Sequence, residues 1–120
     1  MATKILVKNV REPKTRQDGF RILVDRLWPR GMTREAVDYD AWEKELAPGT
    51  GLRKWFGHQP ERWEGFRKKY LEELRHNEAV AGFVAAYRSH AVITLLFGAK
   101  DHEHNQAIVL QEYLQPLMNK

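Results

Sequence analysis

The chain has 120 residues, of which 42% are hydrophobic and 30% are charged. This length suits one domain with one buried core, so we expect residues 1–120 to form a single domain. The elements described below predict that it is an α/β domain. The composition is too apolar for a disordered chain, and the absence of cysteine excludes disulfides, thiolate nucleophiles and iron–sulfur clusters. The longest apolar run, 91–99, is about half as long as a membrane span, and the first residues do not resemble a secretory signal. We therefore expect a cytoplasmic protein that does not enter the membrane.

Basic residues are concentrated in the first third of the chain. Residues 1–34 carry nine lysines and arginines against three acidic residues, a net charge of +6, whereas the remainder carries −2. This asymmetry points to an anionic partner near the N-terminal segment. An arginine-rich solvated surface would give the same pattern.

The first two predicted elements are strands. Lys4–Val10 is compact and rich in β-branched residues, and Phe20–Asp25 is an almost continuous apolar run that follows the turn dipeptide Asp18-Gly19. The link between them is short for a helical crossover. The sequence therefore leaves open whether these strands are parallel neighbours or a hairpin.

Helices are predicted through the middle of the chain. Two short helices are expected at 41–46 and 52–56, separated by a proline and a glycine. A longer helix follows Pro60, which suits a first helical turn, because apolar residues recur at spacings of three and four over 63–74. The apolar positions of 80–87 predict another helix.

The last strand and helix complete the predicted fold. The segment 92–97 is the most apolar in the chain, and apolar residues at helical spacing over 103–117 predict a final helix. Runs that are apolar on both faces are typical of parallel strands covered by helices. We therefore predict an α/β fold, a small three-layer sandwich with a short, mostly parallel sheet covered by helices. The last strand joins the second strand through a helical crossover.

The exit of the second strand carries residues suited to an anion. Open parallel sheets bind ligands beyond the carboxyl ends of their strands, and here Asp25, Arg26, Trp28 and Arg30 follow the strand directly. The two arginines and a neighbouring glycine suit an anion cradle. A carboxylate at this position serves either as a structural partner of an arginine or as an acid–base group.

The exit of the last strand is equally polar. A glycine loop that opens a helix presents backbone N–H groups to an anion, and Lys100 adds a positive charge. Asp101 is predicted to cap the last helix. His104 is the candidate general base, ahead of His58, and Asn105 would orient a ligand by hydrogen bonding.

A third polar patch follows residue 50. Arg53 lies on the predicted helix 52–56, where it either reaches the same ligand or belongs to a solvated surface helix over Trp55. The pair His102-x-His104 invites a metal interpretation, but side chains two apart on a helix point to different faces. We therefore predict no metal and no cofactor.

Several of these segments resemble a known family. The run 18–31, the segments 47–48 and 52–56, and the block from 94 to 107 are similar to the hallmark of the YeaO-like family, small bacterial proteins classed as a domain of unknown function. The resemblance covers essentially the whole chain. It implies an α/β sandwich with both strand exits facing one cleft, and it implies no established activity.

The broader superfamily pairs an Asp-x-Arg strand exit with a Cys-His-Arg loop after the last strand. This chain has Asp25-Arg26 at the first position and His104-Asn105, with no cysteine, at the second. If that cysteine acts as a nucleophile, the resemblance implies that this branch retains only ligand binding or acid–base chemistry.

These residues favour two functions over a third, a purely structural or partner-binding role, which the density of polar residues at the strand exits disfavours. The first is binding of a small anionic ligand, a nucleotide or phosphate ester, held by Arg26, Arg30, Lys100 and Arg53, with Asp25 and His104 as acid–base groups if the protein is a transferase or hydrolase. The alternative is a non-catalytic nucleic-acid-binding protein that uses the basic first third, with Trp28 and Trp55 as stacking platforms. The sequence does not decide turnover or the oligomeric state.

Overall fold

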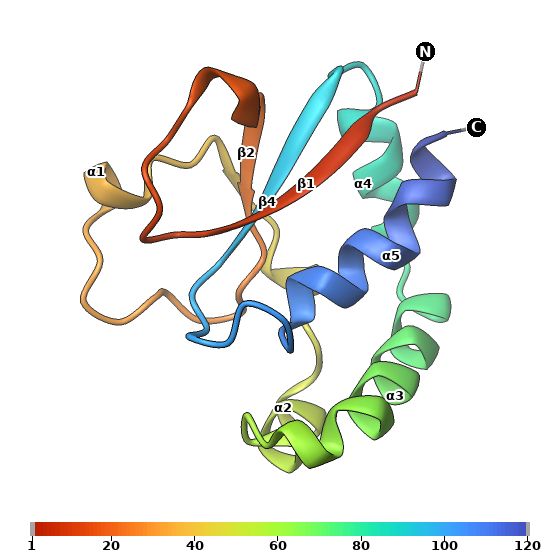
Figure 1. Cartoon of the computed structure of the whole chain (residues 1–120). Coiled ribbons are helices and arrows are strands. Elements are labelled where there is room, and N and C mark those ends of the chain that lie inside the picture. Colours follow the sequence, from red (N-terminus) through yellow and green to blue (C-terminus); the bar gives the residue numbers. More distant parts are fainter. Residues whose placement is uncertain (1, 120) are drawn as a thin grey trace.

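The fold is built on a parallel sheet whose strands are not in chain order (Figure 1). The computed structural model describes residues 2–119. Within them the sheet has four strands in the order β1-β4-β2-β3, and every neighbouring pair is parallel. The strands are β1 (Lys4–Asn9), β2 (Phe20–Leu23), β3 (Ala41–Trp42) and β4 (Val92–Phe97). The predicted α/β fold is confirmed, and the sheet is parallel throughout this part of the chain.

The first two strands are neither neighbours nor a hairpin. β4 lies between them and pairs with both, so that Leu95 is opposite Val7 on one side and Ile22 on the other. The connection over 10–19 returns without an α-helix and contains only a 3-10 turn, Arg16–Asp18. Ten residues reach about 33 Å when extended, which is enough to run back along a six-residue strand. The hairpin alternative is therefore wrong, and the other holds in that the two strands are parallel but not in that they are neighbours.

Four of the five α-helices fall where the apolar spacing placed them, although their ends shift by a few residues. They are α2 (Thr50–Phe56), α3 (Trp63–Arg75), α4 (Ala79–Tyr87) and α5 (Gln106–Met118). The 3-10 turn Pro60–Arg62 leads directly into α3. The segment from α2 to α4 forms the predicted helical crossover into β4, which lies beside β2.

The prediction of a helix at 41–46 is wrong. Ala41 and Trp42 form the short edge strand β3, and Lys44–Leu46 is a 3-10 turn. The backbone N–H groups of Asp40 and Glu43 donate to the carbonyls of Arg21 and Leu23, at 2.7 and 2.9 Å. These tertiary hydrogen bonds to β2 override the local helical pattern. The one-turn helix α1 (Arg34–Val37), capped by the Thr33 side chain, was not predicted.

Two buried clusters lie on the two faces of the sheet. Successive buried residues of β2 and β4 point alternately into one cluster and the other, because side chains alternate between the two faces of a strand. Ile22 and Leu95 belong to the larger cluster with α2, α3, α4 and α5, whereas Leu23 and Leu96 belong to a smaller cluster with Val37 of α1. In Figure 1 the long helices accordingly lie on one side of the sheet and α1 with its loops on the other.

Helix α5 protects the exposed edge of β1. An edge strand leaves alternate backbone groups without a partner in the sheet. Gln115 accepts from the Ile5 N–H at 2.8 Å and donates to the Thr3 carbonyl at 2.7 Å, and Gln111 donates to the Ile5 carbonyl at 2.8 Å. The glutamines of α5 therefore take the place of a fifth strand over part of this edge.

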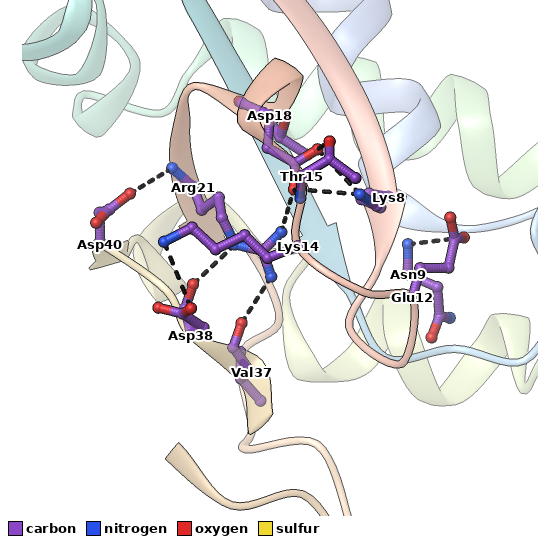
Figure 2. Close-up of polar contacts among 11 residues, drawn as sticks. Lys8, Asn9, Glu12, Lys14, Thr15, Asp18, Arg21, Val37, Asp38 and Asp40 are labelled. Atoms are coloured by element: carbon purple, nitrogen blue, oxygen red, sulfur yellow. Dashed lines mark hydrogen bonds and ion pairs between the residues drawn. The ribbon is translucent and has the colours of Figure 1, made fainter. Parts of the chain in front are cut away.

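Basic residues of the first third are used inside the fold (Figure 2). Arg21 is 1% exposed, and its guanidinium donates to Asp18 at 2.5 Å and to the carbonyls of Val37 and Asp38 at 2.7 Å. Asp18 also accepts from Lys8 at 3.0 Å. Burial alone would raise the pKa of Asp18, but hydrogen bonds from Lys8, Thr15 and Arg21 outweigh it and lower the pKa to about 2. In the part of the chain described, no helix has the length and apolar character needed to cross a membrane.

Candidate functional site

A cleft of about 250 Å³ opens at the carboxyl ends of β2 and β4. Both strand exits contribute to it, together with α2 and the start of α5. It brings together seven of the eight residues singled out from the sequence: Asp25, Arg26, Trp28, Arg30, Arg53, His104 and Asn105. This is the position that the rule for open parallel sheets indicates for a ligand.

Asp25 is held at the base of the cleft between the two strand exits. Its carboxylate accepts from the Gly98 backbone N–H at 2.9 Å and from the side-chain amide of Gln106. A Cβ at position 98 would lie 2.8 Å from the Asp25 carboxylate and 3.2 Å from Pro29, so only glycine permits this approach. Burial raises the pKa of Asp25 to about 6, although these hydrogen bonds and the charges of Arg11 and Arg53 oppose the rise.

The side chains of Arg26 and Trp28 form part of the cleft wall and donate hydrogen bonds to backbone carbonyls. The Arg26 guanidinium donates to the carbonyls of Ala47 and Pro48, at 3.0 and 3.4 Å, and so fixes the segment that leads into α2. The Trp28 indole donates to the Met32 carbonyl at 2.7 Å. Its ring packs edge-on against aromatic rings of the smaller buried cluster. Both side chains line the cleft, and both also hold the loop in place.

Arg30 and Arg53 bring positive charge to the cleft without acidic partners. Among residues 2–119, neither side chain forms an ion pair or hydrogen bond, and the Nε of Arg53 is buried with no partner. A buried donor without a partner costs roughly 1–3 kcal/mol. An exposed arginine such as Arg30 is commonly unpaired, but an unpartnered buried Nε, as in the half-buried Arg53, is unusual.

His104 is oriented by Asp101 within the loop before α5. The ring Nδ1 lies 2.9 Å from the Asp101 carboxylate, which also accepts from the backbone N–H groups of Glu103 and His104 at 2.9 Å. Hydrogen bonds from the Glu103 N–H and the His104 ring lower the pKa of Asp101 to about 2. An Nδ1–H that donates to Asp101 leaves Nε2 as the acceptor of the neutral imidazole. His58, at a positive φ of 58°, lines the same cleft.

Asn105, and not Asp101, caps the last helix. Its side-chain oxygen accepts from the Ile108 N–H at 3.2 Å, and its amide donates to the Asp101 carbonyl at 3.0 Å. The prediction of Asp101 as the cap of α5 is therefore wrong, because Asp101 closes the preceding turn. Asn105 is 2% exposed, and both polar atoms of its side chain are engaged by the backbone. Its contribution to the site is to position His104 and the start of α5.

Three residues differ from the sequence-based expectation of the site. Lys100 is exposed and is not among the residues that line the cleft, because the tight turn around Asp101 places it elsewhere. Gln106, which holds Asp25, was not singled out, since a glutamine in the first turn of a helix has no distinctive chemistry. Arg11 was also missed: its guanidinium donates to the carbonyls of Gly98 and Arg30, at 3.0 and 3.1 Å, and ties the two exits together.

No cluster of three or more histidine, aspartate or glutamate residues suited to a metal ion occurs within 2–119. The Asp25 carboxylate and the His104 imidazole instead have hydrogen-bond partners from the protein.

Comparison with known proteins shows which family the whole chain resembles. Residues 4–120 match the family model described as the inactive DUF488-N3 subclade. The uncharacterized protein YeaO of Escherichia coli is 41% identical over 113 residues, which cover 94% of this chain and 98% of YeaO. The uncharacterized protein Rv3073c of Mycobacterium tuberculosis is 35% identical over 112 residues, covering 93% of this chain and 94% of that protein. No solved structure matches the chain.

Proposed function

We propose that this chain, which belongs to the YeaO-like family and to its inactive DUF488-N3 subclade, binds a small anionic ligand, a phosphate ester or nucleotide, in the cleft at the ends of β2 and β4. The observation that carries this proposal is the set of guanidinium groups that line the cleft without acidic partners. Arg53 and Arg30 would contact the anion directly, and Arg26 would add its charge from the wall.

The contrast with the rest of the fold supports this assignment. Several buried or half-buried cations elsewhere are neutralised by carboxylates, as Arg21 and Lys8 are by Asp18, and Arg67 is by Glu112. Arg62 instead donates to the Trp55 carbonyl. Leaving charge unpaired in a partly buried cleft destabilises the empty protein. An anion would satisfy these groups and recover that free energy as binding affinity.

The size of the cleft limits the ligand. At about 250 Å³, it lies just below the range of roughly 300–1,000 Å³ that is typical of pockets for drug-sized molecules. A monophosphate suits this volume better than a triphosphate or an oligomer does. Lys100 is exposed and does not line the cleft, so we do not include it among the residues proposed to contact the ligand.

Binding without turnover is the form of this proposal that agrees with the family. The chain has no cysteine to act as a nucleophile, and the matching family model is described as inactive. We therefore assign Asp25 and His104 to ligand recognition in the first instance. Hydrolase or transferase activity through these two acid–base groups remains a separate prediction that a turnover assay addresses.

The nucleic-acid alternative loses support from the way the basic residues are used. In the described part of the chain, five of the nine basic side chains of 1–34 contact protein groups: Lys8, Arg11, Lys14, Arg21 and Arg26. Trp28 packs into the smaller cluster, and the Trp55 ring is contacted by Arg62 and Lys69, at 5.4 and 5.1 Å from its centre. Trp28 therefore offers no uncovered stacking platform, and Trp55, although 39% exposed, already carries two cations near its ring.

A thermal-shift screen followed by titration calorimetry tests the proposal. The probes are inorganic phosphate, ribose 5-phosphate, nucleoside monophosphates and a ten-residue oligothymidine. We expect a monophosphate to raise the melting temperature of the wild type and of Lys54→Met, but not of Arg53→Met. Lys54 is the matched control because it is exposed, neighbours Arg53 on α2 and does not line the cleft.

Two results would refute the proposal. One is the absence of stabilisation by any of the phosphates. The other is stabilisation by the oligonucleotide alone that falls steeply with salt and is unchanged in Arg53→Met and His104→Ala, which would indicate the nucleic-acid alternative.

A further inference from the structure

The cleft contains charges of both signs that form no direct ion pair among the described residues. Among residues 2–119, Asp25 forms no ion pair, although Arg53 lines the same cleft close enough for its charge to act on the Asp25 carboxyl. Arg53 likewise has no acidic partner, and its Nε has no hydrogen bond at all. A ligand with only a negatively charged group would bind the arginines but would place that negative charge beside the Asp25 carboxylate.

Asp25 retains hydrogen-bonding capacity after its protein contacts are made. One carboxylate oxygen accepts from the Gly98 N–H and the other from the Gln106 amide. A carboxylate offers about four acceptor positions, so each oxygen can accept once more. Because both contacts come from donors, Asp25 is held as an acceptor, and the group that completes its coordination must be a donor.

Apolar side chains line the cleft beside its charged groups. Phe56, Phe66 and Pro29 contribute to its lining, and Leu27 at the same site is 63% exposed. Such surfaces suit the carbon part of a ligand. A ligand that covered this exposed leucine would remove its apolar surface from contact with water, which favours binding.

We infer that the ligand is a compact phosphate ester whose carbon part carries a nitrogen donor, so that the arginines bind the phosphate while Asp25 accepts the N–H. This inference rests on the proposed anion site and adds a specificity-determining residue to it. An amine and the N–H edge of a nucleobase share this chemistry, and separate probes distinguish them. A site that accepts a hydrogen bond from its ligand discriminates strongly against analogues that lack the donor.

Two matched pairs of probes test the inference by titration calorimetry. Phosphoethanolamine is compared with monoethyl phosphate, which lacks the amine, and guanosine 5′-monophosphate is compared with ribose 5-phosphate, which lacks the base. A hydrogen bond to a charged acceptor predicts that the nitrogen-bearing member of one pair binds roughly 10- to 100-fold more tightly in the wild type. The pair that shows the gain identifies the donor as an amine or a base edge.

The variant Asp25→Asn isolates the carboxylate. Its side-chain oxygen can still accept from Gly98, and the Gln106 amide can rotate to accept from the new NH₂ group, so the loop contacts have replacements. We expect the gain within the pair to disappear while binding of the phosphate alone is retained. Asp38→Asn, an exposed carboxylate outside the cleft, is the matched control and should behave as the wild type.

The outcomes separate this inference from the proposed function. Equal affinity within both pairs in the wild type overturns the inference and leaves the anion site standing, and this comparison does not depend on the variant folding. A gain that persists in Asp25→Asn also overturns it. Failure of every phosphate to bind overturns the anion site and, with it, the inference.

Discussion

Replacing Asp18 by asparagine should strongly destabilise the protein. Asp18 is 4% exposed and neutralises two cations, Arg21 at 2.5 Å and Lys8 at 3.0 Å, and Arg21 itself is 1% exposed. Asparagine keeps the shape of the side chain but removes the negative charge, which leaves a buried guanidinium without a counter-ion. The perturbation therefore tests whether the basic residues of the first third stabilise the fold.

The expected loss is large relative to the total stability. Breaking a buried ion pair by removing one partner costs roughly 3–5 kcal/mol, against about 5–15 kcal/mol for a whole domain. For a chain of this size, that corresponds to a fall in melting temperature of roughly 10–20 °C. The pH dependence gives a second estimate of the free energy that Asp18 contributes. The pKa of Asp18 is lowered from 3.8 to about 2, so its carboxylate contributes about 2 kcal/mol above pH 4, which is lost as the pH falls toward 2.

Urea unfolding at pH 7 and at pH 3, followed by circular dichroism, provides the assay. The control is Asp38→Asn: Asp38 has φ 48°, a conformation that asparagine also tolerates, and its side chain makes only an exposed ion pair with Lys14 at 3.4 Å. The control should change stability by less than about 0.5 kcal/mol. If Asp18→Asn costs less than about 1 kcal/mol, or no more than the control, the description of these basic residues as structural is refuted.

Other predictions concern the cleft and the sheet. Because the folded pKa of Asp25, about 6, is above its unfolded value, Asp25→Asn should raise the free energy of unfolding at pH 7 by on the order of 2 kcal/mol, and by nothing at pH 4; a benefit that does not change with pH contradicts this. Arg53→Met should leave the empty protein as stable or up to about 2 kcal/mol more stable, because its buried Nε has no partner; a clear loss in urea unfolding contradicts this. Arg30→Ala should cost less than about 1 kcal/mol, since Arg30 is exposed, and a loss of folding would instead mark a structural role. Leu95→Asp should abolish folding because it places an unpaired charge at a fully buried site of β4; a soluble, folded variant would contradict the sheet.

The long apolar elements could be read from the sequence because each is defined by its own pattern. β4 is buried on both faces, and its bounds, Val92–Phe97, coincide with the apolar run. β3 has two residues and no pattern of its own, since its position is set by hydrogen bonds to β2. The insertion of β4 between β1 and β2 likewise depends on a segment about seventy residues further along the chain, which local patterns do not report.

The candidate site was predictable to the extent that strand exits determine it. Asp25, Arg30 and His104 converge on one cleft because the carboxyl ends of parallel strands meet at one edge of the sheet. The loop before α5 was less predictable, because the turn closed by Asp101 displaces Lys100 from the lining. Gln106 was missed because its role follows from a tertiary contact with Asp25, not from its residue type.

The most direct test of the central claim is a ¹H–¹⁵N NMR titration of the protein with a nucleoside monophosphate. The anion site predicts saturable shifts of the backbone amides at 25–31 and 98–106, together with the side-chain signal of Arg53 Nε. The same titration of Arg53→Met should show weakened or absent shifts at these positions. Shifts confined to exposed basic residues outside the cleft, such as Lys4 and Arg16, or no shifts at millimolar ligand, would contradict the account.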